Sequence, residues 1–94
     1  MEWRLFANLA ETAGTKRVTV EAAPGDTLGD AFEQLLAAHP ELEAEVLDES
    51  GDLREHIRAL RNDTDPFRAG EGFGTTLEAG DELALFPPVS GGAR

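Results

Sequence analysis

The chain has 94 residues, no cysteine and a formal net charge of −11, from nineteen Asp and Glu against eight Lys and Arg. A chain of this length builds one small core and not two. Without cysteine it forms no disulfide, no iron–sulfur cluster and no thioester on its own side chains, which excludes plant-type ferredoxins and conjugating enzymes that work through a thiol. The acidity argues against direct binding of nucleic acid, because phosphates attract basic surfaces.

We interpret the excess of carboxylates as a solvated acidic surface. Such a surface repels itself unless salt screens it, and at molar salt the Debye length is only about 3 Å. A salt-rich cytoplasm, as in halophiles, therefore fits the composition. No apolar run approaches the roughly 18 residues of a membrane span, and Glu2 and Arg4 interrupt the start where a signal peptide needs an apolar core. We expect a cytoplasmic protein without a membrane partner.

The first twenty residues predict two strands joined by a short connection. Every second residue is apolar over residues 3–7, from Trp3 to Ala7, and again at Val18 and Val20. This is the period of a strand. The connection covers residues 8–15 and ends at Gly14.

The middle of the chain predicts the main helix. Pro24-Gly25-Asp26 forms a turn, and Thr27 stands three residues before Asp30, the spacing of a capping pair. Apolar residues then recur at helical spacing until His39-Pro40 stops the helix: Leu28, Ala31, Phe32, Leu35 and Leu36. A second short helix is expected over residues 41–47, closed by a turn at residues 49–52.

The last third of the chain predicts two strands separated by a loop. One strand covers residues 56–60, and Gly80-Asp81 turns the chain into the final strand, Glu82 to Phe86. Residues 62–74 are expected to be irregular, because three glycines and Pro66 prevent regular structure. Phe67 and Phe73 would hold this loop to the body of the protein.

These elements predict an α+β fold of the β-grasp (ubiquitin-like) type over residues 1–86. A single main helix can cover one face of a mixed sheet of four or five strands. Alternation directs Trp3, Leu5, Val18, Val20, Ile57, Leu83 and Leu85 toward the helix. The same alternation sends Phe6, Ala84 and Phe86 to the opposite face, and Leu60 joins them because Ala59-Leu60 breaks the period.

A tail follows the predicted domain, with the sequence Pro87-Pro88-Val89-Ser90-Gly91-Gly92-Ala93-Arg94. Proline fixes φ near −65° and glycine removes side-chain bulk, so residues 87–94 are expected to form a narrow, extended and flexible strip. Diglycine alone is often only a flexible end. Its meaning therefore depends on the residues that precede it.

The stretch from Gly80 to Gly92 resembles the terminus of the small archaeal modifier proteins and of the molybdopterin synthase small subunit. These MoaD- and ThiS-like proteins are ubiquitin-like carriers. Residues 5–14 resemble that family's first strand and the short turn of helix after it, and residues 56–62 resemble its central strand. The resemblance implies a β-grasp fold whose first and last strands are parallel at the centre. The chain departs from the pattern in extra residues over 63–74 and in Ala93-Arg94 after the diglycine.

The resemblance implies that the reactive group is the carboxylate of Gly92, beside Gly91. An E1-like activating enzyme would attach AMP to this carboxylate. Its active site would have to enclose the last two residues closely, so that a Cβ on either residue would collide with the walls of that site. Sulfur would then yield a thiocarboxylate for the molybdopterin synthase large subunit or for tRNA thiolation, and a target-protein lysine would yield an isopeptide bond. Because Ala93 and Arg94 follow, we expect a precursor that a zinc metalloprotease cleaves between Gly92 and Ala93. Such a protease would also remove the modifier from its targets.

The predicted partner-binding residues surround the start of this tail: Phe6, Leu60, Phe86, Pro87, Pro88 and Val89. Scattered surface hydrophobes are ordinary, but Phe86 lies immediately before the tail. A partner that grips this face would hold the tail in register.

The sequence predicts no catalytic residue, no metal and no cofactor, and hence no enzyme. His39 and His56 lack further ligands at metal spacing. Ser90 has no local base, and the acidic run at residues 41–49 lacks the spacing of a calcium loop. The alternative interpretation is a non-covalent β-grasp binding module with an incidental tail. Mass spectrometry of protein from its native cells separates the two, since only a carrier would be found ending at Gly92 or linked through it.

Overall fold

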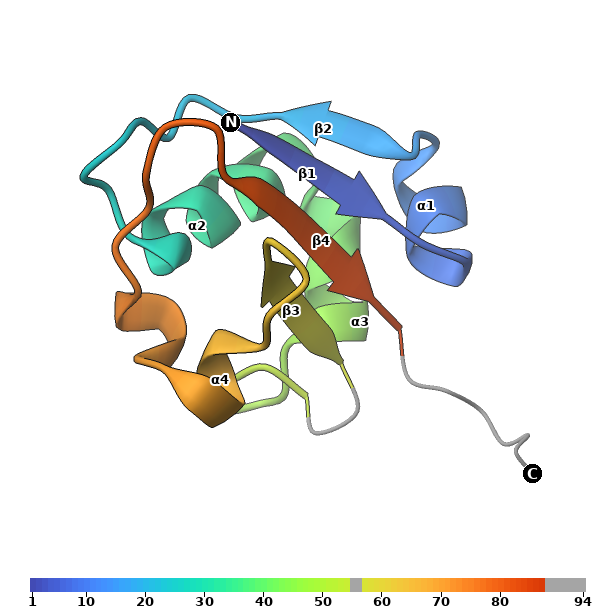
Figure 1. Ribbon diagram of the computed structural model, residues 1–94. Helices are drawn as coiled ribbons and strands as arrows, with labels where there is room; N and C mark the ends of the chain where they lie inside the picture. The colour runs from blue at the N-terminus through green and yellow to red at the C-terminus, as the bar shows by residue number, and fades with distance from the viewer. Residues whose placement is uncertain (55–56, 88–94) are drawn as a thin grey trace.

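The computed structural model describes residues 1–54 and 57–87. In this part of the chain a four-stranded sheet forms one layer (Figure 1), with β1 (Glu2–Leu5), β2 (Arg17–Thr19), β3 (Arg58–Arg61) and β4 (Glu82–Phe86) in the order β2-β1-β4-β3. The central strands β1 and β4 are parallel, with Trp3 opposite Leu83, and both edge strands are antiparallel to their neighbours. This arrangement confirms the predicted β-grasp fold and its parallel central pair.

The second layer is formed by helices, of which α2 (Leu28–Ala38) is the longest. It begins where the sequence predicts, because the Thr27 hydroxyl accepts a hydrogen bond from the Asp30 amide at 3.2 Å and the Asp30 carboxylate accepts one from the Thr27 amide at 3.0 Å. The predicted short helix is divided into η1 (Pro40–Leu42) and α3 (Glu43–Val46), and α1 (Asn8–Ala13) follows β1. Across the described ranges, every helix is too short or too polar to cross a bilayer.

The core lies between the sheet and α2. Trp3 is fully buried, its indole nitrogen donates to the Ala31 carbonyl at 3.1 Å, and its ring meets Phe32 edge-on at 6.0 Å between centroids. All seven residues that alternation directs inward are buried, although Ile57 precedes β3: Trp3, Leu5, Val18, Val20, Ile57, Leu83 and Leu85. Burial of these side chains is the main stabilising contribution of the fold.

The strand boundaries differ from the sequence prediction at two places. The alternation predicts that the first strand continues to Ala7, but β1 ends at Leu5, and Ala7 is an exposed residue with φ 53° that precedes α1. A positive φ is rare for alanine, and no alternation pattern reports it. The predicted strand over residues 56–60 is observed as Arg58–Arg61, with His56 outside the described residues.

Residues 62–74 are more regular than predicted, because they contain α4 (Pro66–Ala69) and η2 (Gly72–Gly74). The Asp65 carboxylate accepts a hydrogen bond from the Phe67 amide at 2.9 Å, and Pro66 occupies the first helical position. Proline at this position starts a helix and does not break it. The irregular-loop prediction was wrong because it treated Pro66 only as a breaker.

Aromatic contacts hold this segment against the body, as predicted. The Phe73 ring lies 5.2 Å from Phe32 and meets Phe67 edge-on at 4.8 Å. Phe73 is partly buried against the core, while Phe67 keeps 40% of its surface exposed. Segment 62–74 is therefore an ordered part of the domain.

Candidate functional site

In the sequence, the tail follows directly after β4, and Figure 1 shows β4 as one of the two central strands of the sheet. β4 ends at Phe86, and Pro87, which is half-buried, is the last described residue. Several predicted site residues lie outside the described part of the chain: Pro88, Val89, Gly91, Gly92 and Ala93. Because β4 is hydrogen-bonded to β1 on one side and β3 on the other, the point from which the tail departs is fixed on both sides.

The opposite end of β4 is anchored by the buried carboxylate of Asp81. It accepts hydrogen bonds from Arg61 Nε at 2.7 Å, Asn62 Nδ2 at 2.9 Å and the Glu78 amide at 2.7 Å. Burial acts to raise the pKa of Asp81, but these hydrogen bonds outweigh burial and hold the pKa below its usual value. The ionised carboxylate thus ties the end of β3 to the start of β4.

An aromatic pair lies on the face of the sheet turned away from α2. The rings of Phe6 and Phe86 stack with centroids 4.2 Å apart and planes 7° from parallel, and both side chains are half-buried. In the strand register Ala84 lies opposite Leu60 on β3, so these two side chains share that face. We call Phe6, Leu60, Ala84 and Phe86 the outer patch. The structure therefore brings the predicted residues Phe6, Leu60 and Phe86 together beside Pro87.

Arg4 belongs to this surface and was missed by the sequence reasoning. Its guanidinium carbon lies 5.8 Å from the centroid of the Phe6 ring, within cation–π distance. The signal was present, because residues two apart on a strand share a face and Arg4 precedes Phe6 by two. The sequence prediction used the strand period to place apolar residues only.

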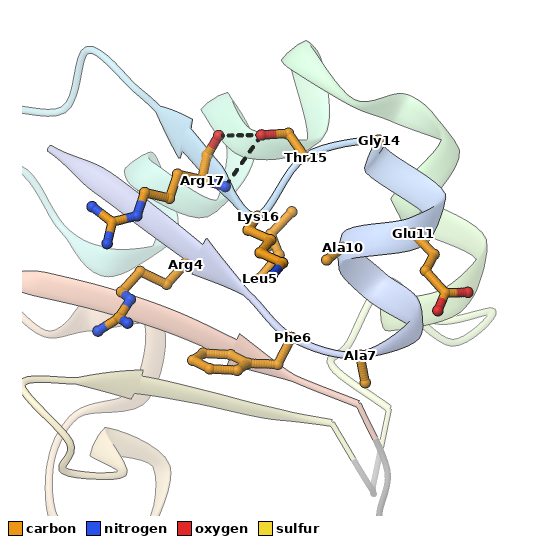
Figure 2. Close-up of a pocket in the computed structure, with 10 residues that line it drawn as sticks. All are labelled: Arg4, Leu5, Phe6, Ala7, Ala10, Glu11, Gly14, Thr15, Lys16 and Arg17. Carbon is orange, nitrogen blue, oxygen red and sulfur yellow. Dashed lines mark hydrogen bonds between the residues drawn. The ribbon is translucent and has the colours of Figure 1, made fainter.

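A groove of about 730 Å³ borders the outer patch at Phe6 (Figure 2). It is formed by the end of β1, by α1 and by the turn into β2, and Arg4, Lys16 and Arg17 line it. The Thr15 hydroxyl stabilises this turn, because it accepts from the Arg17 amide at 3.3 Å and donates to the Arg17 carbonyl at 3.0 Å. The groove combines apolar walls with these three exposed cations and the exposed carboxylate of Glu11.

The described residues contain no group of three His, Cys, Asp or Glu side chains arranged to hold a metal. His39 Nδ1 lies 3.0 Å from Glu41 Oε2. The backbone of Glu41 and the His39 ring together hold the pKa of the Glu41 carboxyl below its usual value. Both residues precede or lie within η1, away from the outer patch. The outer patch and the groove beside it therefore offer apolar and charged contacts next to the start of the tail.

Comparison with known proteins places the chain among small carriers. It matches the ThiS family over residues 3–92. It is 51% identical over 94 residues to small archaeal modifier protein 1 of Haloferax volcanii, covering 98% of this chain and 100% of the relative. It is 32% identical over 88 residues to the molybdopterin synthase sulfur carrier subunit of Chlamydomonas reinhardtii, covering 93% and 92%. The crystal structure of the Haloferax volcanii protein aligns with a TM-score of 0.85 and 49% identity over 97% of each chain.

Proposed function

This chain belongs to the ThiS family of ubiquitin-like modifiers and sulfur carriers, and we propose that an E1-like enzyme of the cytoplasm activates it by adenylating the carboxylate of Gly92. The chain is a carrier on which enzymes act and not an enzyme itself. The observation that carries the proposal is the extent of the family match, which runs to Gly92 and stops before Ala93-Arg94. The Haloferax relative also agrees with the salt-rich cytoplasm that the acidity suggests.

Activation converts a poor electrophile into a reactive one. A carboxylate oxygen of Gly92 attacks the α-phosphorus of ATP, pyrophosphate leaves, and a mixed anhydride with AMP forms. Hydrosulfide sulfur can then displace AMP to give a thiocarboxylate, or the amine of a target lysine can displace it and lose a proton to give an isopeptide bond. A relative named as a modifier and another named as a sulfur carrier subunit support both outcomes. The thiocarboxylate would serve a molybdopterin synthase large subunit or tRNA thiolation.

Maturation must precede this step. In the chain the carbonyl of Gly92 is joined to the nitrogen of Ala93, so Gly92 has no free carboxylate. The residues that follow Gly92 also include Arg94, whose long cationic side chain does not fit a channel shaped for glycine. We propose that a zinc metalloprotease directs a metal-bound water to the Gly92 carbonyl carbon, and that the Ala93 amine leaves with a proton. The same chemistry would release the modifier from lysines.

The outer patch supplies the docking surface for the activating enzyme. Phe86 is the last residue of β4, and its stacking on Phe6 presents two rings beside Pro87. From Pro87 to Gly92 the chain spans at most about 20 Å, at roughly 3.3 to 3.6 Å per residue. An enzyme that grips the patch, together with Pro88 and Val89, would thus receive Gly92 in a channel while the domain stays outside.

The test is ATP–pyrophosphate exchange by the cognate activating enzyme. We compare chains that end at Gly92, Ala93 and Arg94, each verified by mass after the assay, and expect exchange only with the Gly92 form. The Ala93 form separates the need for a terminal glycine from the effect of the arginine charge. Equal exchange by an intact Arg94 form would overturn the precursor proposal. Tight binding without exchange by any form would leave a non-covalent binding module.

A further inference from the structure

The charge of the chain is divided unequally along the sequence. Residues 21–53, which include α2, η1 and α3, contain ten of the nineteen carboxylates and none of the eight Lys and Arg. The remainder has nine carboxylates against all eight cations and is nearly neutral. In Figure 1, α2 and α3 lie behind the sheet. The net charge of −11 is therefore concentrated in residues 21–53, which we call the helix layer.

Three cations line the groove that borders the outer patch, and we call Arg4, Lys16 and Arg17 the cationic rim. All three are exposed and line the groove beside Phe6 (Figure 2). Arg4 stands directly opposite Arg17 across β1 and β2, and the two side chains extend in the same direction. Like charges placed opposite each other destabilise a sheet. Since the chain has more than twice as many carboxylates as cations, fold stability gives no reason for this pairing.

Nearby carboxylates leave most of the rim available. Glu2 lies 3.4 Å from Arg17, but the two side chains are 44% and 63% exposed, so the contact is weak. Glu11 on α1 also lines the groove, but its carboxylate points away from Arg4 and Arg17 (Figure 2). Within residues 1–54 and 57–87, no carboxylate forms an ion pair with Arg4 or Lys16. Three other arginines each lie within 4.0 Å of a carboxylate oxygen: Arg58, Arg61 and Arg68.

We propose that the cationic rim and the outer patch together select a protein partner whose docking surface has an apolar centre flanked by carboxylates, and that this partner is the activating enzyme. The inference rests on the proposed function. At molar salt the Debye length is about 3 Å, so the rim acts through direct Arg–carboxylate and Lys–carboxylate contacts and not through long-range attraction. The same partner surface placed against residues 21–53 would face mainly carboxylates, with Arg54 beside them, whose Nε donates to the Ala44 carbonyl at 3.2 Å. The division of charge thus permits one docking orientation and opposes the reverse one.

Charge reversal at the rim, with a matched reversal elsewhere, tests this inference. We use the chain ending at Gly92 and make Arg4→Glu, Lys16→Glu and, as the control, Arg68→Glu. The side chain of Arg68 is 71% exposed and lies on α4, which is near β3 at the edge of the sheet opposite β2 (Figure 1). Its reversal changes the net charge by the same amount as each rim variant. Calorimetric titration with the activating enzyme in about 1 M potassium chloride gives the Kd, and circular dichroism verifies the fold of each variant.

Arg4→Glu is expected to weaken binding roughly tenfold or more, and Lys16→Glu severalfold, whereas Arg68→Glu leaves the Kd within about twofold. Arg4→Lys should retain most of the affinity, because it keeps the charge. Equal weakening by all three reversals would mean that only total charge matters and would overturn the inference. Unchanged binding by both rim variants, alongside loss of binding by Phe86→Asp, would overturn it while the proposed function stands. Absence of binding by the unmodified chain would overturn both.

Discussion

The stack of Phe6 on Phe86 is expected to contribute modestly to stability and strongly to activation. Truncating a fully buried Phe to Ala costs about 3 to 5 kcal/mol. Each of these rings is half-buried, so we expect about 2 kcal/mol for Phe6→Ala and for Phe86→Ala. A parallel aromatic pair at this separation adds a coupling of about 0.5 to 1.5 kcal/mol. The double variant should therefore lose less stability than the two single variants together, by that amount.

Trp3 gives a direct assay, because it is the sole tryptophan of the chain and is fully buried. Urea unfolding followed by its fluorescence gives the free energy of unfolding for the four members of the cycle. Each variant is then compared in ATP–pyrophosphate exchange as the chain ending at Gly92. We expect folded proteins whose exchange kcat/KM falls roughly tenfold or more, about 1.4 kcal/mol of lost transition-state binding.

Phe67→Ala is the control, since Phe67 is a surface phenylalanine, 40% exposed, that lies on α4 and not on the outer patch. Its loss should leave exchange unchanged. Costs above about 4 kcal/mol for Phe86→Ala would show that the ring is part of the core. Normal exchange by both Phe86→Ala and Phe86→Asp would refute the assignment of the outer patch as a docking surface.

Three further outcomes are expected. Raising monovalent salt from about 0.1 M to about 2 M should raise the melting temperature by screening the repulsion among the carboxylates of the helix layer; a flat or falling melting temperature would show that this repulsion is not a folding liability. Asp81→Asn should cost about 2 kcal/mol of unfolding free energy near neutral pH. The pKa of Asp81 is lowered in the folded state, so its contribution to the free energy of unfolding is fully present well above pH 3.8, the ordinary pKa of Asp, and disappears as pH falls through the folded-state pKa. The free energies of unfolding of the two proteins, measured by urea titration, should therefore converge in acid. A difference that stays constant with pH would contradict this account. Thr27→Ala should cost about 1 kcal/mol by removing the α2 cap, measured by thermal unfolding, whereas Thr76→Ala on the exposed surface should change little.

Local patterns were sufficient to predict the parts of the fold that depend on local rules. The Thr27 cap, the stop at Pro40 and the burial of Trp3 follow from spacing along the chain, and each is observed. The pairing of Arg4 with Arg17 could not be predicted, because it depends on the register between two strands separated by helix α1. The same holds for Asp81, whose donors Arg61 and Asn62 lie about twenty residues earlier in the chain.

Other differences arise where one residue type has two uses. Pro66 terminates regular structure in most contexts but begins α4 when Asp65 caps it. Ala7 adopts a conformation that alanine rarely occupies, so its identity gave no warning that β1 ends two residues earlier. The outer patch was predictable because strand alternation alone separates the two faces of a sheet. The rim beside it was not found because the prediction considered apolar residues only.

The parallel pairing of β1 with β4 has a consequence for synthesis of the protein on the ribosome. β3 is paired with β4, and β1 meets β3 only through β4, so within the described chain the sheet stays in two parts until the final strand is available. Contacts between residues 2–5 and 82–86 are about as distant in sequence as this chain allows, and such contacts form late in folding. A nascent or truncated chain that lacks β4 therefore also lacks Phe86 and everything that follows it. The sheet and the outer patch are therefore completed in the same step, when β4 pairs with β1 and β3.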